Sequence, residues 1–304
     1  MASHDRVDVE IDGRRLSLSH LDKVLFPSTG FTKGALLDYY RRIAPVMLPH
    51  LGDRPVTLRR YPNGVEDQGF FEKHVPAHAP KWVRSVTVPS STNGGADVAY
   101  TMIGDLPSLL WAANLDSIEF HVPLWHAGGR RKLPAPPDHV VFDLDPGPGT
   151  DIVDCCRVAV WIASEVEGSQ WPGSGIYPKT SGSKGLQLYL PVSGRPTWER
   201  VKEYAHHMAT TLASDHPDAV ATSMRKVERH GKVLIDWSQN SPSKTTVAAY
   251  SVRARPEPSV STPLAWEEVA RAARGGNPDR LRFLTDQVVA RVARDGDRFA
   301  PLAP

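Results

Sequence analysis

The segment VVFDLDPGPG, residues 140–149, decides the predicted fold of this chain of 304 residues. An apolar run followed by a Pro-Gly-Pro-Gly turn is typical of a buried strand that ends abruptly. Because side chains alternate along a strand, Asp143 and Asp145 should project from one face while Leu144 points into the core. Two like charges this close are unfavourable unless a cation neutralises them. The pattern indicates a cation site or, as the alternative, two solvated turn aspartates.

A third acid favours the cation site. Asp236 lies in the apolar segment Val233–Trp237, where an ionised carboxylate is costly unless it is paired or bound to a metal. Three strand-borne aspartates are the minimal ligand set for phosphoryl transfer with two metal ions. Because all these ligands are oxygens, Mg²⁺ or Mn²⁺ suits the site better than Zn²⁺.

The segment KTSGSKG, residues 179–185, is predicted to join two strands and is a candidate phosphate cradle. Its hydroxyls, lysines and flexible backbone N–H groups can face an anion. The spacing of a Walker A loop is absent. Ser181 and Lys184 match the S-x-x-K signature of penicillin-binding enzymes, but the glycines and flanking strands disfavour the helix that this signature opens. A serine acyl transferase is therefore the weaker interpretation.

Positive charge is concentrated near Asp236, although the whole chain carries a net charge of only +2. Between Met224 and Arg255 the bases are Arg225, Lys226, Arg229, Lys232, Lys244, Arg253 and Arg255, against the acids Glu228 and Asp236. Such a cluster suits the phosphates of a nucleotide or a nucleic acid, and a solvated basic face is the alternative.

Two further features leave alternatives open. The pair Phe70-Phe71 stands among polar residues, and an exposed aromatic pair can stack on bases, although most such pairs belong to a core. His121 alternates with apolar residues, so a core histidine with satisfied hydrogen bonds is its default interpretation.

Composition excludes several classes of protein. The chain has 40% hydrophobic residues and no apolar run long enough for a membrane span, and its N-terminus does not resemble a secretory leader. The adjacent Cys155 and Cys156 are poorly placed for a disulfide. We therefore expect a globular protein of the reducing cytoplasm with no membrane partner.

The remaining sequence predicts the α+β class, because strands and helices mix without a regular βαβ repeat. Residues 1–20 predict a hairpin, residues 130–137 a linker, and residues 70–71 lie in a loop-like setting. Predicted helices cover 34–48, 107–116, 151–167, 197–214, 264–274 and 279–294. Predicted strands cover 54–60, 118–122, 140–145, 175–178, 186–191, 233–237 and 246–252.

Together these residues resemble the polymerase domain of bacterial ligase D, the break-repair branch of the archaeo-eukaryotic primase superfamily. The matching motifs are Asp22–Pro27, Tyr61–Val65, Phe70–Lys73, Glu119–Pro123, Phe142–Gly147, Thr180–Leu186 and Asp236–Asn240. The resemblance implies a primase-like catalytic core of mixed, largely antiparallel sheets flanked by helices. It implies a single domain over 1–304, with an N-terminal half (1–130) for DNA-end and template contacts, a catalytic half (138–256) and C-terminal helices (257–304).

The resemblance further implies a metal-dependent nucleotidyltransferase that adds ribonucleotides or deoxyribonucleotides to a primer 3′-hydroxyl at short gaps or double-strand-break ends. Implied ligands are two Mn²⁺ or Mg²⁺ ions, an NTP or dNTP, and gapped or broken duplex DNA with a 5′-phosphate. Implied protein partners are Ku and a separate DNA ligase. The implied location is the cytoplasm, in association with the nucleoid. By position, the metal ligands and catalytic residues would be Asp143, Asp145 and Asp236. Nucleotide-binding residues would be His121, Ser181, Ser183, Lys184, Gln187, Gln239 and Arg253, and DNA-binding residues would be His20, Lys23, Lys33, Phe70, Phe71, Lys73 and Arg229.

Two positions depart from the family pattern. Gln187 stands where the family usually has histidine, so a neutral amide replaces a positively charged or general-acid contact. His20 stands where the family often has asparagine, which would alter 5′-phosphate recognition or make it depend on pH. Two alternatives remain: a standalone primase-polymerase for gap or excision repair, and a non-catalytic module that binds DNA ends. The length leaves no room for a ligase module, so we expect a standalone polymerase or part of a larger ligase.

Overall fold

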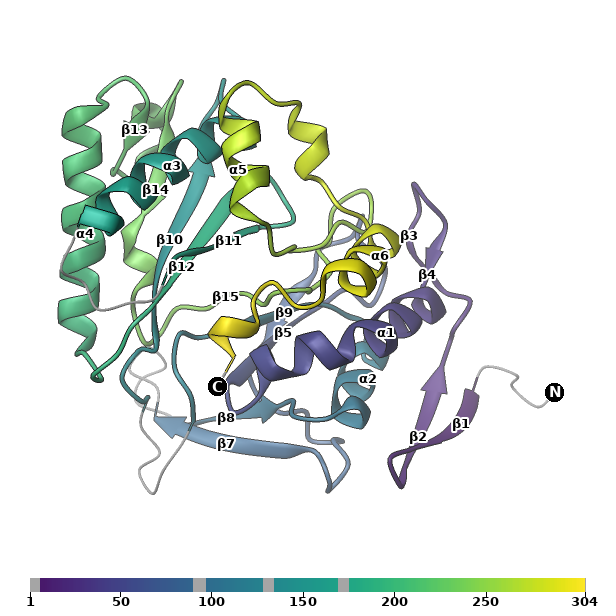
Figure 1. The fold of residues 1–304 in the computed structure, drawn as a ribbon. Helices are drawn as coiled ribbons and strands as arrows, with labels where there is room; N and C mark the ends of the chain where they lie inside the picture. Colours follow the sequence, from purple (N-terminus) through teal and green to yellow (C-terminus); the bar gives the residue numbers. More distant parts are fainter. Residues whose placement is uncertain (1–5, 90–96, 128–133, 169–174, 304) are drawn as a thin grey trace.

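The computed structural model describes residues 6–89, 97–127, 134–168 and 175–303. Two large β-sheets occupy the centre of the molecule, and helices cover them (Figure 1). The first sheet has the strand order β15-β9-β5-β8-β7, with β6 paired to β5, and the second has the order β11-β12-β10-β14-β13.

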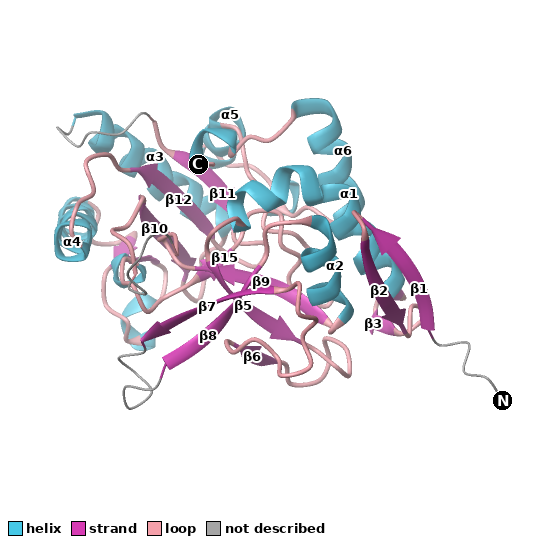
Figure 2. Cartoon of the chain, turned by 90° about the horizontal axis from the view of Figure 1, so that it is seen from below, coloured by secondary structure: helices cyan, strands magenta, loops and turns pink. Residues whose placement is uncertain are grey.

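The first sheet is antiparallel throughout its described strands. These are β5 (Pro55–Arg60), β6 (Phe70–Glu72), β7 (Arg84–Pro89), β8 (Asp97–Met102), β9 (Ser117–Val122) and β15 (Thr246–Val247). Two helices, α1 (Lys33–Leu51) and α2 (Leu106–Asn114), pack against each other beside this sheet (Figure 2). Helix α1 begins after Thr32, whose hydroxyl accepts a hydrogen bond from the Ala35 N–H at 3.2 Å and so caps the first turn.

The second sheet carries the segment 140–149. Its strands are β10 (His139–Pro146), β11 (Tyr177–Thr180), β12 (Leu186–Pro191), β13 (Val220–Ala221) and β14 (Val233–Asp236), and the described pairs are antiparallel except β13 with β14. The helices α3 (Ile152–Gly168) and α4 (Trp198–Asp215) pack on β10, and α5 (Trp266–Ala273) packs on α3.

The side chains of β10 point alternately into two different hydrophobic cores. Val140, Phe142 and Leu144 belong to the core shared with α3 and α4, and each is fully buried. Burial of side chains of this size contributes roughly 1.5–3 kcal/mol each. Val141 belongs instead to the core of the first sheet, and Asp143 follows on that same face. The aspartates therefore lie on the face of the second sheet that turns toward the first.

The two sheets are connected by the short strand β15. After β14 the chain returns to the first sheet, where Thr246 pairs with Val122 and Val247 pairs with His121. The hydroxyls of Tyr189 on β12 and Thr246 share a hydrogen bond of 2.8 Å, so a side chain of the second sheet also contacts this strand. These contacts fix the distance between the aspartates and the residues of β9.

The remaining elements lie at the periphery. They are β1 (Arg6–Ile11), β2 (Arg14–Ser19), β3 (Val24–Phe26), β4 (Phe31–Thr32), α6 (Thr285–Asp295) and the 3₁₀ turns Lys226–Arg229, Trp237–Gln239, Pro278–Leu281 and Ala300–Leu302. None of the helices in the described part of the chain has the length and apolar character needed to cross a bilayer.

The α+β prediction is confirmed, and so are the first hairpin, with its turn at Asp12-Gly13, and the strand over residues 140–145. The prediction of a loop at Phe70-Phe71 was wrong, because these residues form β6 and pair with Arg60 and Arg59 of β5. Strands β7 and β8 were not predicted from the sequence. Residues 130–133 of the predicted linker lie outside the described residues, and 134–137 have no regular structure.

Two C-terminal predictions need correction. The strand predicted over 246–252 ends at Val247. The Ala248 N–H still bonds to the Phe120 carbonyl, but the Phe120 N–H donates to the Ser251 hydroxyl at 2.9 Å, and Tyr250 adopts a positive φ of 67°. The helix predicted over 279–294 is interrupted. A 3₁₀ turn ends at Leu281, and Ser259 forms an isolated β-bridge with Leu284, so a helix begins only at Thr285.

Candidate active site

Strand pairing brings the three predicted metal ligands together. Asp143 on β10 lies directly opposite Asp236 on β14, and Asp145 lies two residues further along β10. Paired residues of antiparallel strands project to the same face. Asp143 and Asp236 are buried, at 8% and 5% exposure, whereas Asp145 is exposed at the end of the strand. One patch of the sheet therefore carries three carboxylates.

These carboxylates repel one another. Burial, and then the charge of Asp145, raise the pKa of Asp143. Partial loss of hydration, together with the charge of Asp236, raises the pKa of Asp145 although its side chain reaches solvent. No group of three His, Cys, Asp or Glu side chains in the described ranges is already arranged to hold a metal ion. Like charges on one patch are unfavourable unless a cation neutralises them, and an all-oxygen donor set suits a hard divalent ion. The residues thus fit such a metal.

Neighbouring amides and hydroxyls orient the buried acids. Asp143 accepts hydrogen bonds from Gln187 Nε2 at 3.0 Å and from Gln239 Nε2 at 3.3 Å. Asp236 Oδ1 accepts from the backbone N–H and the hydroxyl of Ser238, and Lys244 Nζ lies 3.8 Å from Asp236 Oδ2. The buried Gln239 Oε1 has no hydrogen-bond partner within the described residues, so it is available to a ligand.

Residues 181–185, which connect β11 to β12 and which we call the serine-lysine loop, lie against the end of β10. The hydroxyl of Ser181 accepts hydrogen bonds from the N–H groups of Ser183, at 3.2 Å, and Gly185, at 3.1 Å. A Cβ on Gly185 would lie 2.2 Å from the Leu144 carbonyl oxygen, so only glycine permits this approach. The side chain of Lys184 is exposed. The loop therefore places a lysine beside the aspartates, while the N–H groups of Ser181, Ser183 and Gly185 hold the loop in shape.

A buried glutamate connects two predicted nucleotide-binding residues. Glu119 on β9 is fully buried and accepts a hydrogen bond from His121 Nε2 at 2.8 Å. Its other oxygen forms an ion pair with Arg253 Nε at 3.2 Å and accepts from the Ala254 N–H at 3.0 Å. Burial alone would raise the pKa of Glu119, but His121, Arg253 and the backbone donor outweigh it and lower the pKa. Arg253 Nη1 also donates to the Ser181 carbonyl at 2.6 Å.

These groups surround one cavity of about 420 Å³, which we call the active-site cavity. Of the predicted site residues, His121, Asp143, Asp145, Ser181, Ser183, Lys184, Gln187, Arg229, Gln239 and Arg253 line it. Asp236 lies beside it through its pairing with Asp143. Arg229 reaches the cavity while its guanidinium donates to the carbonyls of Ser223 and Met224.

The predicted 5′-phosphate contacts form a separate group. Lys23 Nζ lies 2.9 Å from Asp116 Oδ2, and Lys33 Nζ lies 3.4 Å from Asp116 Oδ1. Lys33 is 2% exposed, and burial lowers its pKa although Asp116 opposes this. His20 is exposed in a positive-φ conformation at the end of β2. A ligand phosphate at this group would have to compete with the carboxylate of Asp116.

The aromatic pair extends from β6 near the active-site cavity. Phe71 is 55% exposed, and its ring meets that of His121 edge-on at 5.4 Å between centroids. The guanidinium of Arg59 lies over the Phe71 ring at 5.1 Å, and that of Arg60 lies over the Phe70 ring at 5.4 Å. Lys73 follows on the surface. The Phe71 ring thus stands beside a residue that lines the cavity, and Phe70 is exposed next to it along β6.

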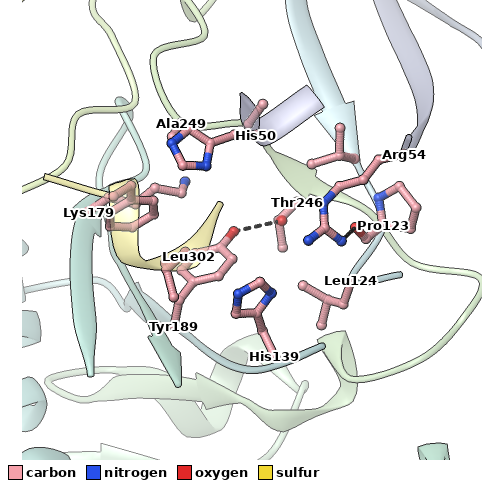
Figure 3. A pocket seen from close by; sticks show the side chains of 13 residues that line it. His50, Arg54, Pro123, Leu124, His139, Lys179, Tyr189, Thr246, Ala249 and Leu302 are labelled. Atoms are coloured by element: carbon pink, nitrogen blue, oxygen red, sulfur yellow. Dashed lines mark hydrogen bonds between the residues drawn. The ribbon is translucent and has the colours of Figure 1, made fainter. Parts of the chain in front are cut away.

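A second, smaller cavity of about 40 Å³ lies behind the first, where the two sheets meet (Figure 3). Lys179 and Tyr189 of the second sheet face Arg54 and His50 of the first half across it. Lys179 is 1% exposed, and burial lowers its pKa to about 7 against the opposing charge of Asp143.

Sequence reasoning gave Glu119 no role and counted Lys179 among the lysines of the phosphate cradle, which was wrong because Lys179 is buried on β11 and does not line the active-site cavity. Both contact predicted site residues, yet in the sequence Glu119 stands only as a charged residue in an apolar run and Lys179 as the first residue of a polar loop. A charged residue inside a predicted buried strand is the signal that could have identified Glu119.

Comparison with known proteins identifies the family. A model of the LigD primase-polymerase domain matches residues 32–299. The multifunctional non-homologous end joining protein LigD of Mycolicibacterium smegmatis is 38% identical over 95% of this chain, and the bifunctional LigD of Bacillus subtilis is 32% identical over 94%. The chain spans only 36% and 44% of the lengths of these two relatives.

A solved structure gives the same result. The polymerase domain of Mycobacterium tuberculosis ligase D in complex with DNA superimposes with a TM-score of 0.87 at 38% identity, covering 95% of this chain and 99% of that chain. The resemblance inferred from the motifs is thereby confirmed. The chain therefore belongs to the LigD primase-polymerase domain family, the nucleotidyltransferases of the archaeo-eukaryotic primase superfamily.

Proposed function

We propose that this chain extends a primer 3′-hydroxyl by one or a few nucleotides at short gaps or at double-strand-break ends in end joining. The observation that carries this proposal is the active-site cavity, in which Asp143 and Asp145 face the serine-lysine loop and Arg253. Clustered carboxylates opposite bases and backbone N–H groups suit a metal-bound triphosphate.

The bases and polar groups of the cavity would hold the incoming NTP or dNTP. Lys184 and Arg253 balance the charge of the triphosphate, and the hydroxyls of Ser181 and Ser183 add hydrogen bonds. The open acceptor of Gln239 suits a hydroxyl donor of the nucleotide, and Gln187 completes the wall beside Asp143. His121 lies at the edge of this site, oriented by Glu119.

Polymerase domains of this family use divalent metal, and we propose two ions, with Mn²⁺ preferred over Mg²⁺, held by Asp143, Asp145 and Asp236. Bound metal lowers the pKa of the primer hydroxyl and stabilises the pyrophosphate leaving group. The protein contributes the orientation of the acids: the amides of Gln187 and Gln239 hold Asp143, and Ser238 holds Asp236.

We propose that DNA lies across the face that carries β6 and the loop near Arg229. Phe70 and Phe71 would stack on template bases, Lys73 and Arg229 would contact phosphates, and Lys23 and Lys33, with His20, would bind the 5′-phosphate at a gap. The ligase D polymerase domain that superimposes on this chain is in complex with DNA, which supports this assignment. We also propose that this chain works with Ku and a separate DNA ligase on the nucleoid. Residues 1–304 would act as one domain.

Primer extension tests the function. The chain should add a single nucleotide to a one-nucleotide gap bearing a 5′-phosphate when Mn²⁺ and NTP or dNTP are supplied. Extension at broken ends that responds to Ku would support end joining, whereas extension confined to gaps without such a response would indicate gap or excision repair. Tight DNA binding without extension in either metal would replace the enzyme with an end-binding module.

The substitution Lys23→Ala should weaken recognition of the 5′-phosphate. A charge-assisted contact contributes about 1.5–3 kcal/mol, so the preference of the wild type for phosphorylated gaps should fall roughly tenfold or more, with a shallower salt dependence. Binding to gapped duplexes with and without the phosphate, at several salt concentrations, measures this. Arg271→Ala on α5 removes an exposed base remote from this group and serves as control. Equal preference in wild type and Lys23→Ala would remove the assignment.

A further inference from the structure

One row of directly paired residues crosses the second sheet through the proposed metal site. Lys179 on β11 lies opposite Gln187 on β12, Gln187 lies opposite Asp143 on β10, and Asp143 lies opposite Asp236 on β14. Directly paired residues project from the same face of a sheet. A lysine, a glutamine and two aspartates therefore stand side by side, and Lys179 is the member of the row without an assigned function.

Lys179 is deeply buried, and its amine has only neutral partners among the described residues. The amine donates to Gln187 Oε1 at 2.5 Å and to the Ser261 hydroxyl at 2.7 Å, and it lies 5.5 Å from the centre of the Tyr189 ring. Burying an amine without a carboxylate partner is costly, so ordinary packing does not explain it. The nearest acid in the row, Asp143, lies beyond Gln187.

The amine determines which way the Gln187 amide faces. A glutamine amide has one accepting end and one donating end, and an amine that donates to Oε1 leaves Nε2 to face Asp143 Oδ1 at 3.0 Å. A flipped amide would set Nε2 against the amine N–H and Oε1 against a carboxylate oxygen. The Asp143 carboxylate only accepts hydrogen bonds, so it favours the same orientation of the amide.

We propose that Lys179 is a positioning residue for the metal site: acting through Gln187, it holds the Asp143 carboxylate in the orientation that accepts a divalent ion. With Gln239 Nε2 on the other carboxylate oxygen, Asp143 is held from two sides. Lys179 and Gln187 form one unit, which supplies a fixed N–H donor to Asp143 at a position where the resemblance led us to expect histidine. The inference rests on the proposed function, because it takes Asp143 as a metal ligand.

Binding of Mn²⁺ to the full chain without nucleotide or DNA tests this, measured from the electron paramagnetic resonance signal of free Mn²⁺. Lys179→Met should weaken Mn²⁺ binding roughly tenfold, as loss of an outer partner of a metal ligand does. Lys179→Gln, which is also neutral but keeps an N–H donor, should restore most of the affinity. If the charge of Lys179 were its only effect, both variants would bind Mn²⁺ more tightly, because a repelling cation is removed.

A double variant keeps the test valid if Lys179→Met does not fold. Lys179→Met/Gln187→Leu replaces both buried polar partners by apolar side chains, which is close to neutral for folding. It should bind Mn²⁺ no more weakly than the weaker of the single variants Lys179→Met and Gln187→Leu, since the two residues act together. Wild-type affinity in the double variant, or equal affinities of Lys179→Met and Lys179→Gln, would overturn the inference. Absence of Mn²⁺ binding in the wild type would instead overturn the proposed metal site.

Discussion

Asp145→Asn should reduce nucleotidyl transfer by about 10³-fold while leaving binding to gapped DNA unchanged. Asp145 is the exposed member of the three acids, so its carboxylate is free to reach a metal ion and the triphosphate together. The asparagine keeps the shape and removes the charge. A loss of this size corresponds to about 4 kcal/mol of transition-state stabilisation, the magnitude expected for a group that stabilises developing charge. Single-turnover extension with saturating Mn²⁺ and NTP measures it.

The same substitution should not destabilise the protein. Because Asp145 is repelled by Asp236, removal of its charge should leave the free energy of unfolding equal to that of the wild type or slightly higher in metal-free buffer. Glu10→Gln on the exposed face of β1 makes the same chemical change remote from the site and should preserve both activity and stability. Extension by Asp145→Asn at the wild-type rate would contradict the assignment of the catalytic acids.

Glu119→Gln should raise the KM for the nucleotide at least tenfold and lower the free energy of unfolding by about 2–3 kcal/mol. The Glu119 carboxylate accepts hydrogen bonds from His121 and the Ala254 N–H, and it forms an ion pair with Arg253. An amide offers one accepting end, so at least one of these donors would face an N–H group, and Arg253 would lose its counter-charge. Steady-state kinetics at saturating Mn²⁺ and urea unfolding measure the two effects.

The stabilisation of the fold by Glu119 should decrease as the pH is lowered. The pKa of Glu119 is lowered in the folded state, so its charge stabilises the fold fully above the unfolded pKa of about 4.3. The difference in unfolding free energy between wild type and Glu119→Gln should have its full size at pH 7. It should decrease as the pH falls below about 4 toward the pKa of Glu119 in the folded protein. Asp53→Asn, an equivalent change at an exposed ion pair with Arg84, should show neither effect. An unchanged KM in Glu119→Gln would disprove the orienting role.

The sequence predicted the site better than it predicted the sheets. Asp143 and Asp145 were assigned to one face from strand alternation alone, and the structure has them there, because a period of two is a local property of a strand. The proximity of Asp236 could be inferred only from chemistry, since nothing local tells which strands become neighbours. Strands β7 and β8 escaped prediction because only Val88, Val98, Thr101 and Met102 are buried within them, and their pattern is weak.

The residues that orient the proposed site residues could not be predicted from the sequence, because their contacts depend on strand register and on distant parts of the chain. Lys179 is ordinary in sequence, and its function depends on the register that sets it opposite Gln187. A shift by one residue would turn it to the other face of the sheet. Likewise, the pairing of β3 with β4 brings Lys23 and Lys33 together, and the Lys33 N–H donates to the Lys23 carbonyl at 2.8 Å. The acid that both amines contact, Asp116, lies far along the chain, and nothing local identifies it.

The return of the chain to the first sheet also limits how this protein can be divided. Strand β15 forms the edge of that sheet beside β9, although it follows the three proposed metal ligands in the sequence. A fragment that stops before Thr246 would expose the backbone N–H and carbonyl groups of β9, and an uncovered strand edge invites aggregation. The catalytic half is therefore not a module that can be excised or transplanted, and fusions or insertions should be made at the chain ends rather than between the halves.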